Sequence, residues 1–196
     1  MQKRNKFANF IKSNMLYIIA VAVVALVVAI VAIASNGGAG KIKNEVKDPT
    51  VPVDVPAITY SVPVKDFTVL KEYSDTELMY NATLKRWEAH KAIDLSAEAG
   101  SNVVAVADGK VTQVYTNYLE GTVIVIEHSN NMKSLYSSLD SAVKVKVGDA
   151  VKSGDVIGQV GTTANGEHTD GAHLHFEFYR DGVKVNPNDY IAFAEK

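Results

Sequence analysis

The chain has 196 residues, 47% of them apolar, and a formal net charge of −2. It contains no cysteine, which excludes disulfide frameworks, cysteine-ligated zinc, iron–sulfur clusters and thiol nucleophiles. The first 34 residues carry four of the 20 basic residues and no acid, so the remaining 162 residues have a charge of −6. An acidic region without a basic cluster is a poor candidate for nucleic-acid binding.

A run of 20 apolar residues, 15–34, is predicted to be a transmembrane helix. Such a helix rises about 30 Å, the thickness of the hydrocarbon core of a bilayer. The basic N-terminus, residues 1–14, is expected to stay in the cytoplasm, which places the C-terminal part of the chain outside the cytoplasm. The alternative is a cleaved signal peptide ending at Ala34, but the apolar run is longer than the about 7–15 residues usual for a signal sequence.

Residues 35–57 are predicted to be a flexible tether. They open with the sequence Ser-Asn-Gly-Gly-Ala-Gly and include Pro49, Pro52 and Pro56. Glycine makes a chain flexible and spaced prolines favour an extended backbone, so this segment would hold the following domain away from a membrane.

Residues 58–196 are predicted to form one mainly β domain. Short β-branched runs alternate with Gly and Asp at the breaks, which is typical of antiparallel sheet folded as a sandwich or a partly open barrel. One helix is expected around Asp75–Lys85, where Leu78 and Leu84 lie among good helix formers. The expected strands lie near 103–106, 111–115, 122–126, 142–147, 156–158, 176–179 and 183–185.

Two histidines, His173 and His175, lie two residues apart in a β-type sequence. In a strand, residues i and i+2 point to the same face, so the two imidazoles should project together while Leu174 and Phe176 enter the core. Two imidazoles on one face can bind a metal, or one can bind the metal while the other transfers protons. The alternative is two partly exposed histidines on a polar sheet face.

A second pair of polar residues, His90 and Asp94, lies four positions apart. On a straight strand they would be about 13 Å apart, too far to share one ion, so the chain must turn between them. With His175 or His173 they offer a set of imidazole and carboxylate ligands typical of catalytic zinc, with a fourth position left for water. Taken alone, His-x-x-x-Asp is equally compatible with two surface residues.

The chain has five histidines, and the remaining two are less informative. His128 follows an apolar strand and precedes a turn, so it is interpreted as a structural hydrogen-bonding residue. His168 lies in a polar loop, 165–171, and is expected to be solvated.

Together these motifs resemble the LytM-type M23 zinc metallopeptidases, over about residues 88–190. The resemblance rests on His90-x-x-x-Asp94, the segment Gly148–Gly158, and the motif His173-Leu174-His175, in the family's order. It implies a β-rich LytM fold, zinc ligation by His90, Asp94 and His175, and a catalytic role for His173. Family enzymes cut peptide cross-bridges of bacterial peptidoglycan.

The sequence departs from the family pattern at one position. Family enzymes usually carry a second catalytic histidine in a Tyr-x-His-Leu segment, and here the matching residues are Tyr136-Ser137-Ser138-Leu139. Ser138 therefore stands where that histidine is expected. A serine hydroxyl stabilises an oxyanion poorly, and loss of one such donor typically costs about 10²–10³ in rate. Zinc binding could persist while peptidase activity is weak or lost.

A narrower resemblance is to the stage II sporulation protein Q family, based on the basic N-terminus, the single anchor, the tether, residues 80–87 and Ser138. It implies a forespore membrane protein whose outer domain faces the intermembrane space and pairs with a mother-cell membrane protein similar to stage III sporulation protein AH during engulfment. The leading interpretation is therefore a zinc-binding scaffold.

Two other functions are compatible with parts of the sequence. An active zinc-dependent peptidoglycan endopeptidase of the M23 family would use the same ligands. A biotinyl or lipoyl carrier domain would explain the hairpin-like segment Gly148–Gly158, with Lys110 as the attachment site. The carrier interpretation leaves the histidines and the anchor unexplained.

Overall fold

The computed structural model describes residues 58–193 of the chain. These residues belong to a compact unit that spans Val55–Lys196. The predicted membrane helix, 15–34, and the predicted tether, 35–57, lie outside the described residues. Among residues 58–193, no helix is long and apolar enough to cross a membrane.

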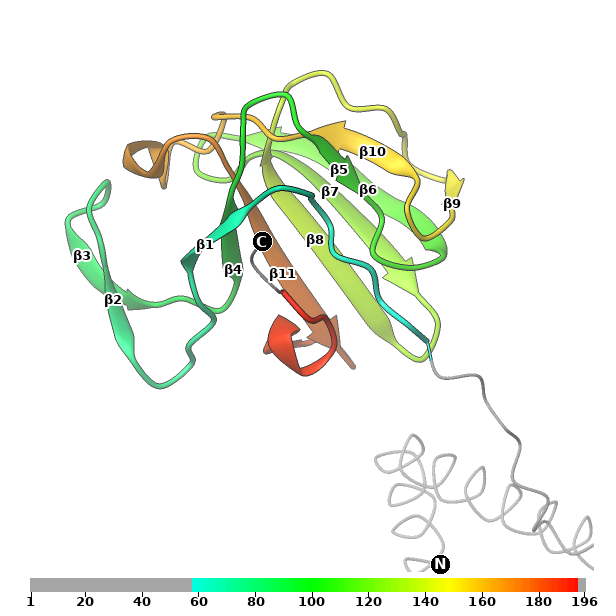
Figure 1. Ribbon diagram of the computed structural model, residues 1–196, viewed down its shortest axis with the longest axis horizontal. Helices are drawn as coiled ribbons and strands as arrows, with labels where there is room; N and C mark the ends of the chain where they lie inside the picture. Colours follow the sequence, from blue (N-terminus) through cyan, green and yellow to red (C-terminus); the bar gives the residue numbers. More distant parts are fainter. Residues whose placement is uncertain (1–57, 194–196) are drawn as a thin grey trace, which may run out of the picture. The chain divides into compact units, whose positions relative to one another are not determined.

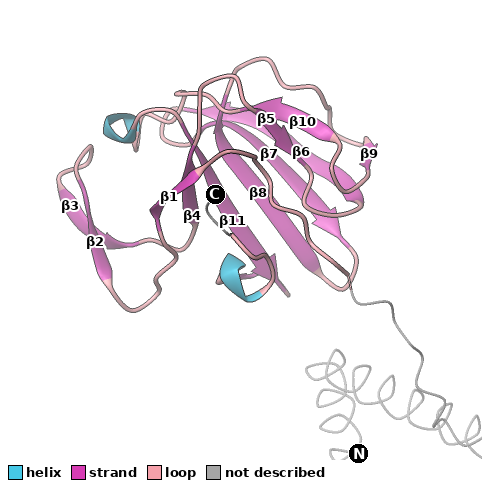
Figure 2. Cartoon of the chain, viewed as in Figure 1, coloured by secondary structure: helices cyan, strands magenta, loops and turns pink. Residues whose placement is uncertain are grey.

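Strands make up nearly all of the regular structure between residues 58 and 193, and two single-turn 3-10 helices complete it (Figure 2). The elements in chain order are β1 (Thr68–Lys71), β2 (Leu78–Asn81), β3 (Arg86–Ala89), β4 (Ile93–Ser96), β5 (Asn102–Val104), β6 (Gly109–Asn117), β7 (Gly121–His128), β8 (Met132–Leu139), β9 (Ala150–Val151), β10 (Val156–Gln159), η1 (His168–Asp170), β11 (His173–Arg180), β12 (Val183–Val185) and η2 (Pro187–Asp189). The predicted mainly β fold is confirmed.

The strands form one large sheet and two small ones. The large sheet has the order β1-β4-β11-β8-β7-β6-β9, with β12 added beside β11, and every pairing is antiparallel. β5 and β10 pair as a second layer over the middle of this sheet (Figure 1). The β2–β3 hairpin projects from the side of the body beside β1 and β4 (Figure 1). The antiparallel sheets predicted from the turn pattern are thus present, and the large sheet ends at β1 and β9.

The core lies between the large sheet and the β5–β10 layer. Val103 of β5 and Ile157 of β10 pack with Ile124, Leu174 and Phe176 of the large sheet, and all five are 0% exposed. The prediction that Leu174 and Phe176 enter the core is confirmed. Because these two side chains point inward, the alternate residues of β11 are directed to the opposite face, where the candidate site lies.

The prediction of a helix around Asp75–Lys85 is wrong, because these residues form β2 and the turn that leads into β3. The side chain of Asn81 accepts a hydrogen bond from the backbone N–H of Leu84 at 2.9 Å. Lys85 then adopts a φ of 54°, which a helix does not tolerate. The asparagine-stabilised turn outweighs the weak helical pattern of the two leucines.

The strand expected near 142–147 is also wrong, since this segment is irregular in the structure. Its apolar residues alternate, but it contacts the β5–β10 layer without forming a strand, through the N–H of Lys144, which donates to the carbonyl oxygen of Ile157 at 2.9 Å. Val143 and Val145 pack against the core from this irregular segment. The alternation of apolar residues therefore predicted correctly that these side chains point inward, but it did not predict whether the segment pairs as a strand.

His128 is a structural residue, as expected. Its Nε2 lies 2.7 Å from Ser134 Oγ and its Nδ1 lies 2.9 Å from the carbonyl oxygen of Asp108. Ser134 in turn donates to the hydroxyl of Tyr136 at 3.0 Å, and that hydroxyl accepts the N–H of Val106. Burial lowers the pKa of His128, in keeping with a neutral imidazole in this network.

Gly161→Ala is expected to destabilise the fold. A Cβ at this position would lie 2.5 Å from the backbone nitrogen of Asp140 and 2.6 Å from the carbonyl carbon of Leu139. Overpacking of this kind typically costs about 1–3 kcal/mol, which urea unfolding would measure. Gly158→Ala is the matched control, because its nearest new contact is a side-chain atom at 3.5 Å. Equal losses in the two variants would contradict this account.

Candidate metal centre

The site is built on the pairing of β4 with β11. The antiparallel register places His175 directly opposite Asp94 and His173 opposite Ser96. Directly opposed residues on one face lie within side-chain contact, and His175 Nδ1 is 2.8 Å from Asp94 Oδ1. The two histidines therefore share a strand face, as expected. The pairing of β11 with β4 brings Asp94, 81 positions away in the chain, beside His175.

His90 joins this pair because the chain turns just before β4 begins at Ile93. Its Nε2 lies 3.2 Å from Asp94 Oδ2, and its ring is 5.4 Å from the ring of His175, centroid to centroid. The turn that the His-x-x-x-Asp spacing requires is present. The three predicted ligands come together from one turn and two neighbouring strands.

His90 and His175 each have one ring nitrogen in contact with an oxygen on the side away from Asp94. His90 Nδ1 lies 2.9 Å from the carbonyl oxygen of Glu72, to which it can only donate. His175 Nε2 lies 3.3 Å from Glu177 Oε1. These contacts orient the rings so that His90 Nε2 and His175 Nδ1 face Asp94. Fixing of the outer nitrogen by a carbonyl or carboxylate is the usual arrangement around metal-ligating histidines.

Unsatisfied polar atoms converge at the same place. Within the described part of the chain, the buried side-chain atoms without a hydrogen-bond partner are His90 Nε2, Asp94 Oδ2, Ser138 Oγ and His173 Nε2. Buried polar atoms are rarely left unpaired, because each costs about 1–3 kcal/mol. His90 Nε2 and Asp94 Oδ2 lie 3.2 Å apart at the predicted ligand positions, and the Asp94 oxygen also forms an ion pair with Lys71. A metal ion would fit between the histidine nitrogen and the aspartate oxygen.

A fourth candidate ligand, Glu167, was not predicted from the sequence. One donor atom from each of His90, Asp94, Glu167 and His175 lies within 4.8 Å of the others. Glu167 Oε2 is 3.2 Å from His175 Nδ1. Glu167 lies in the polar loop 165–171, and no motif spacing marks this glutamate in the sequence. His168 itself is exposed, as expected.

Lys71 is a second residue that sequence reasoning missed. A bulge in β1 shifts the register between Val69 and Lys71, so that Lys71 rather than Leu70 pairs with Asp94. Its Nζ lies 3.2 Å from Asp94 Oδ2, 3.0 Å from Glu167 Oε1 and 2.5 Å from Asp170 Oδ2. Burial works against the charge, but these carboxylates outweigh it and raise the pKa of Lys71 well above its ordinary value.

The carboxylates at the site are ionised. Burial favours the neutral form of Asp94, but His175 and His90 outweigh it and hold the pKa of Asp94 well below its usual range. The pKa of Glu167 is lowered in the same way, by His173, His175 and Lys71 against burial. Burial opposes the charge of His175, yet Asp94 and Glu167 raise its pKa well above the ordinary value. A metal ion would compete with that imidazole proton.

His173 lies at the inner end of the site and is 1% exposed. Its Nδ1 donates to the carbonyl oxygen of Gly171 at 2.9 Å, and its Nε2 is 3.6 Å from Glu167 Oε2. Burial opposes protonation, but the contact with Glu167 outweighs it and raises the pKa of His173. His173 therefore faces the donor group without belonging to the four donors.

Ser138 is fully buried in a bulge of β8, with a φ of 61°. The N–H of Gly161 donates to its carbonyl oxygen at 2.9 Å, and Gly161 also pairs with His173 in a β-bridge. Ser138 and His173 thus flank the same glycine. Ser137, which is opposite His175 in the sheet, is the serine that lines the open cleft.

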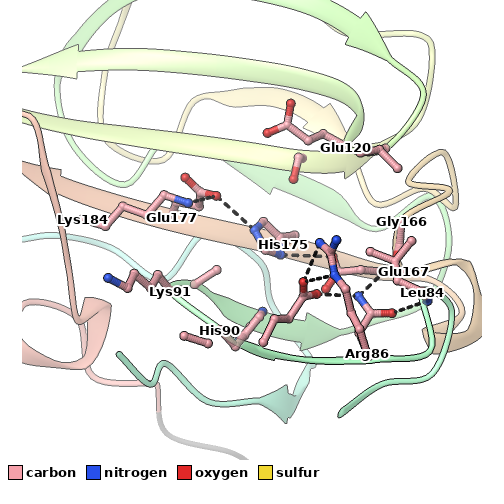
Figure 3. A pocket seen from close by; sticks show the side chains of 16 residues that line it. Leu84, Arg86, His90, Lys91, Glu120, Gly166, Glu167, His175, Glu177 and Lys184 are labelled. Atoms are coloured by element: carbon pink, nitrogen blue, oxygen red, sulfur yellow. Dashed lines mark hydrogen bonds and ion pairs between the residues drawn. The ribbon is translucent and has the colours of Figure 1, made fainter. Parts of the chain in front are cut away.

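A cleft opens over the donors and is lined by charged side chains (Figure 3). His175 lies between Glu177 and Lys184 on one side and Glu167 on the other (Figure 3). Lys184 Nζ and Glu177 Oε1 are 2.6 Å apart, so the cation is paired with the carboxylate that orients His175. The cleft is open to solvent and carries both charged and apolar side chains beside the donors.

The fold and the donor set define an M23-type metallopeptidase domain. The profile of Peptidase family M23 matches residues 88–187, just over half of the chain, so the chain belongs to this family. The resemblance drawn from the histidine motifs is thereby confirmed.

The similar proteins include a sporulation protein and a zinc-containing peptidase. The chain is 32% identical over 174 residues to stage II sporulation protein Q of Bacillus subtilis, covering 81% of this chain and 59% of that protein. A chain of the solved SpoIIQ–SpoIIIAH pore-forming complex superposes with a TM-score of 0.60 at 29% identity, covering 68% of this chain and 91% of that one. The crystal structure of a zinc-containing peptidase from Vibrio cholerae superposes with a TM-score of 0.58 at 29% identity, covering 65% of this chain and 39% of that one.

Proposed function

We propose that this protein is a membrane-anchored, zinc-binding M23 domain that acts as a sporulation scaffold rather than as an efficient peptidase. It would be held by residues 15–34 in the forespore membrane, with residues 1–14 in the cytoplasm and residues 35–57 as tether. The domain 58–196 would face the intermembrane space and pair there with a protein similar to stage III sporulation protein AH. The similarity to stage II sporulation protein Q over 81% of the chain carries this proposal.

The metal part of the proposal is supported by the donor set. His90, Asp94 and His175 would hold the ion, and their imidazole nitrogens and carboxylate oxygen suit zinc better than calcium or magnesium. The orphaned atoms of His90 and Asp94 fit such an ion. In an active member of the family, bound zinc lowers the pKa of a water molecule and polarises a peptide carbonyl. In this chain, His173 is the residue positioned to hold or transfer a proton.

The low peptidase activity that we propose rests on the same site. Ser138 stands where the resemblance places a second histidine, and its hydroxyl is buried and makes no hydrogen bond within the described residues. A serine cannot supply a cation at neutral pH. The substitution of the expected histidine would therefore leave the oxyanion of a cleaved peptide with one donor fewer.

An active peptidoglycan endopeptidase is the alternative. The complete set of three ligands and the likeness to a zinc-containing peptidase favour it. The two functions differ in what they require, since a scaffold needs a partner and an enzyme needs an accessible metal position.

Zinc content is the first test. The purified full chain should bind about one zinc ion, and His90→Ala should bind far less, because the variant loses one of the two imidazole ligands. Metal analysis by mass spectrometry measures the ratio. The control is His168→Ala, which removes an exposed histidine outside the donor group. Zinc-free wild type, or zinc retained by His90→Ala, would contradict the assignment.

Partner binding is the second test. The full chain should co-purify with an AH-like protein from the same cells, whereas an M23 domain from a peptidoglycan endopeptidase should not. Size-exclusion chromatography with light scattering detects the complex. A clean failure of the two proteins to associate at micromolar concentration would refute the scaffold pairing.

Digestion of purified peptidoglycan is the third test. The wild type is expected to release peptides at a rate about 10²–10³-fold below that of an active family enzyme, because it lacks one oxyanion donor. Chromatography of the soluble fragments measures it. Robust release that His173→Ala abolishes would instead establish the endopeptidase alternative.

A further inference from the structure

We propose that Glu167 supplies a fourth protein ligand and closes the metal centre, so that the ion has no open position for water. This inference rests on the proposed zinc site and deepens it. It makes the centre a structural one, since catalytic zinc sites keep one position open whereas structural sites are filled by protein. It also gives a reason for low peptidase activity that is independent of Ser138.

The distances among the donors suit four-coordination. With ligand bonds near 2.0–2.1 Å, the donors of a tetrahedral zinc are about 3.3 Å apart. His90 Nε2 and Asp94 Oδ2 are 3.2 Å apart, and His175 Nδ1 and Glu167 Oε2 are also 3.2 Å apart. The remaining separations stay within 4.8 Å, so small side-chain movements would bring all four donors to one ion.

Glu167 occupies the place that a reactive water would need. Its Oε2 lies 3.2 Å from His175 Nδ1 and 3.6 Å from His173 Nε2. A water bound to the metal and activated by His173 would have to contact both the ion and that imidazole. The carboxylate oxygen of Glu167 already faces both the proposed ligand His175 and the imidazole of His173, and Glu167 is largely buried, with 15% of its side chain exposed.

The loop that carries Glu167 is fixed from two sides. On one side, the amide of Asn81 donates to the carbonyl oxygen of Gly166 at 3.2 Å, and the hydroxyls of Thr83 and Thr169 are 2.7 Å apart. These contacts attach the loop to the β2–β3 hairpin. The carboxylate is therefore positioned by neighbouring structure rather than by chance orientation of an exposed side chain.

Lys71 fixes the loop from the other side. Its Nζ contacts Glu167 Oε1 at 3.0 Å and Asp170 Oδ2 at 2.5 Å. Because Lys71 binds Oε1, the second oxygen of Glu167 remains directed at His173 and His175. The charges also balance, since Lys71 offsets Asp170 and a divalent ion would offset Asp94 and Glu167. Lys71 is thus a positioning residue for the fourth ligand.

Cobalt substitution of the full chain tests the closure. Cobalt(II) takes the place of zinc and its visible spectrum reports coordination number, so acetohydroxamate, a small chelating probe, reveals any open position. The wild type and the control Glu120→Gln, which alters another acid of the same cleft, should show unchanged spectra with the probe. Glu167→Ala should show a spectral change on addition of the probe.

Zinc affinity gives a second readout that does not depend on activity. Competition with a chromophoric chelator should show that Glu167→Ala binds zinc at least about 10-fold more weakly than the wild type. Loss of a residue that only hydrogen-bonds to a metal ligand already costs about 10-fold, and loss of a ligand should cost no less. Circular dichroism establishes that the variant is folded, and Glu167→Gln, which keeps the side-chain volume, should weaken binding in the same direction.

The outcomes separate the two proposals. A wild type that takes up neither zinc nor cobalt refutes the metal site, and the closure with it. A metal-loaded wild type whose spectrum responds to acetohydroxamate as strongly as that of Glu167→Ala refutes the closure alone. Unchanged zinc affinity in both Glu167 variants likewise refutes ligation by Glu167 while leaving the three-ligand site intact.

Discussion

The antiparallel pairing of β4 with β11 is the constraint on which the site depends. It fixes Asp94 opposite His175, and the bulge in β1 fixes Lys71 on the other side of the same aspartate. Strand alternation then sends Leu174 and Phe176 into the core, so the face that carries the histidines is anchored by fully buried apolar side chains. A one-residue slip of β11 would exchange these faces and remove both the core and the donor group.

Charge is concentrated in the site and compensated there. Asp94 is completely buried, yet its carboxylate faces two imidazoles and the ammonium group of Lys71. Burying an unpaired charge would be prohibitive, so this set of groups is stable only together. The same arrangement allows the fold to persist with protons on the imidazoles or with a metal ion among them.

The sequence predicted the fold class and the three donors because both depend on local patterns. The spacing of His173 and His175 predicted a shared strand face, and sharing of an ion by His90 and Asp94 required a turn between them. The ligand set itself came from the resemblance to the family. The sequence prediction failed at Asp75–Lys85, where the hydrogen bond from the Leu84 N–H to the side chain of Asn81 favours a turn over a helix. It also failed at Lys71 and Glu167, which lie 96 positions apart and belong to no spaced motif.

The sequence by itself determined a β-rich domain with a histidine and aspartate donor set, preceded by an apolar segment, because residue type and short-range periodicity suffice for these. Only the tertiary structure decided which other side chains share the site. Glu167 comes from a loop fixed by the β2–β3 hairpin and Lys71 from the edge strand β1, and neither position follows from local spacing. Contacts between distant segments depend on register and on a bulge, and those are settled by packing of the whole sheet.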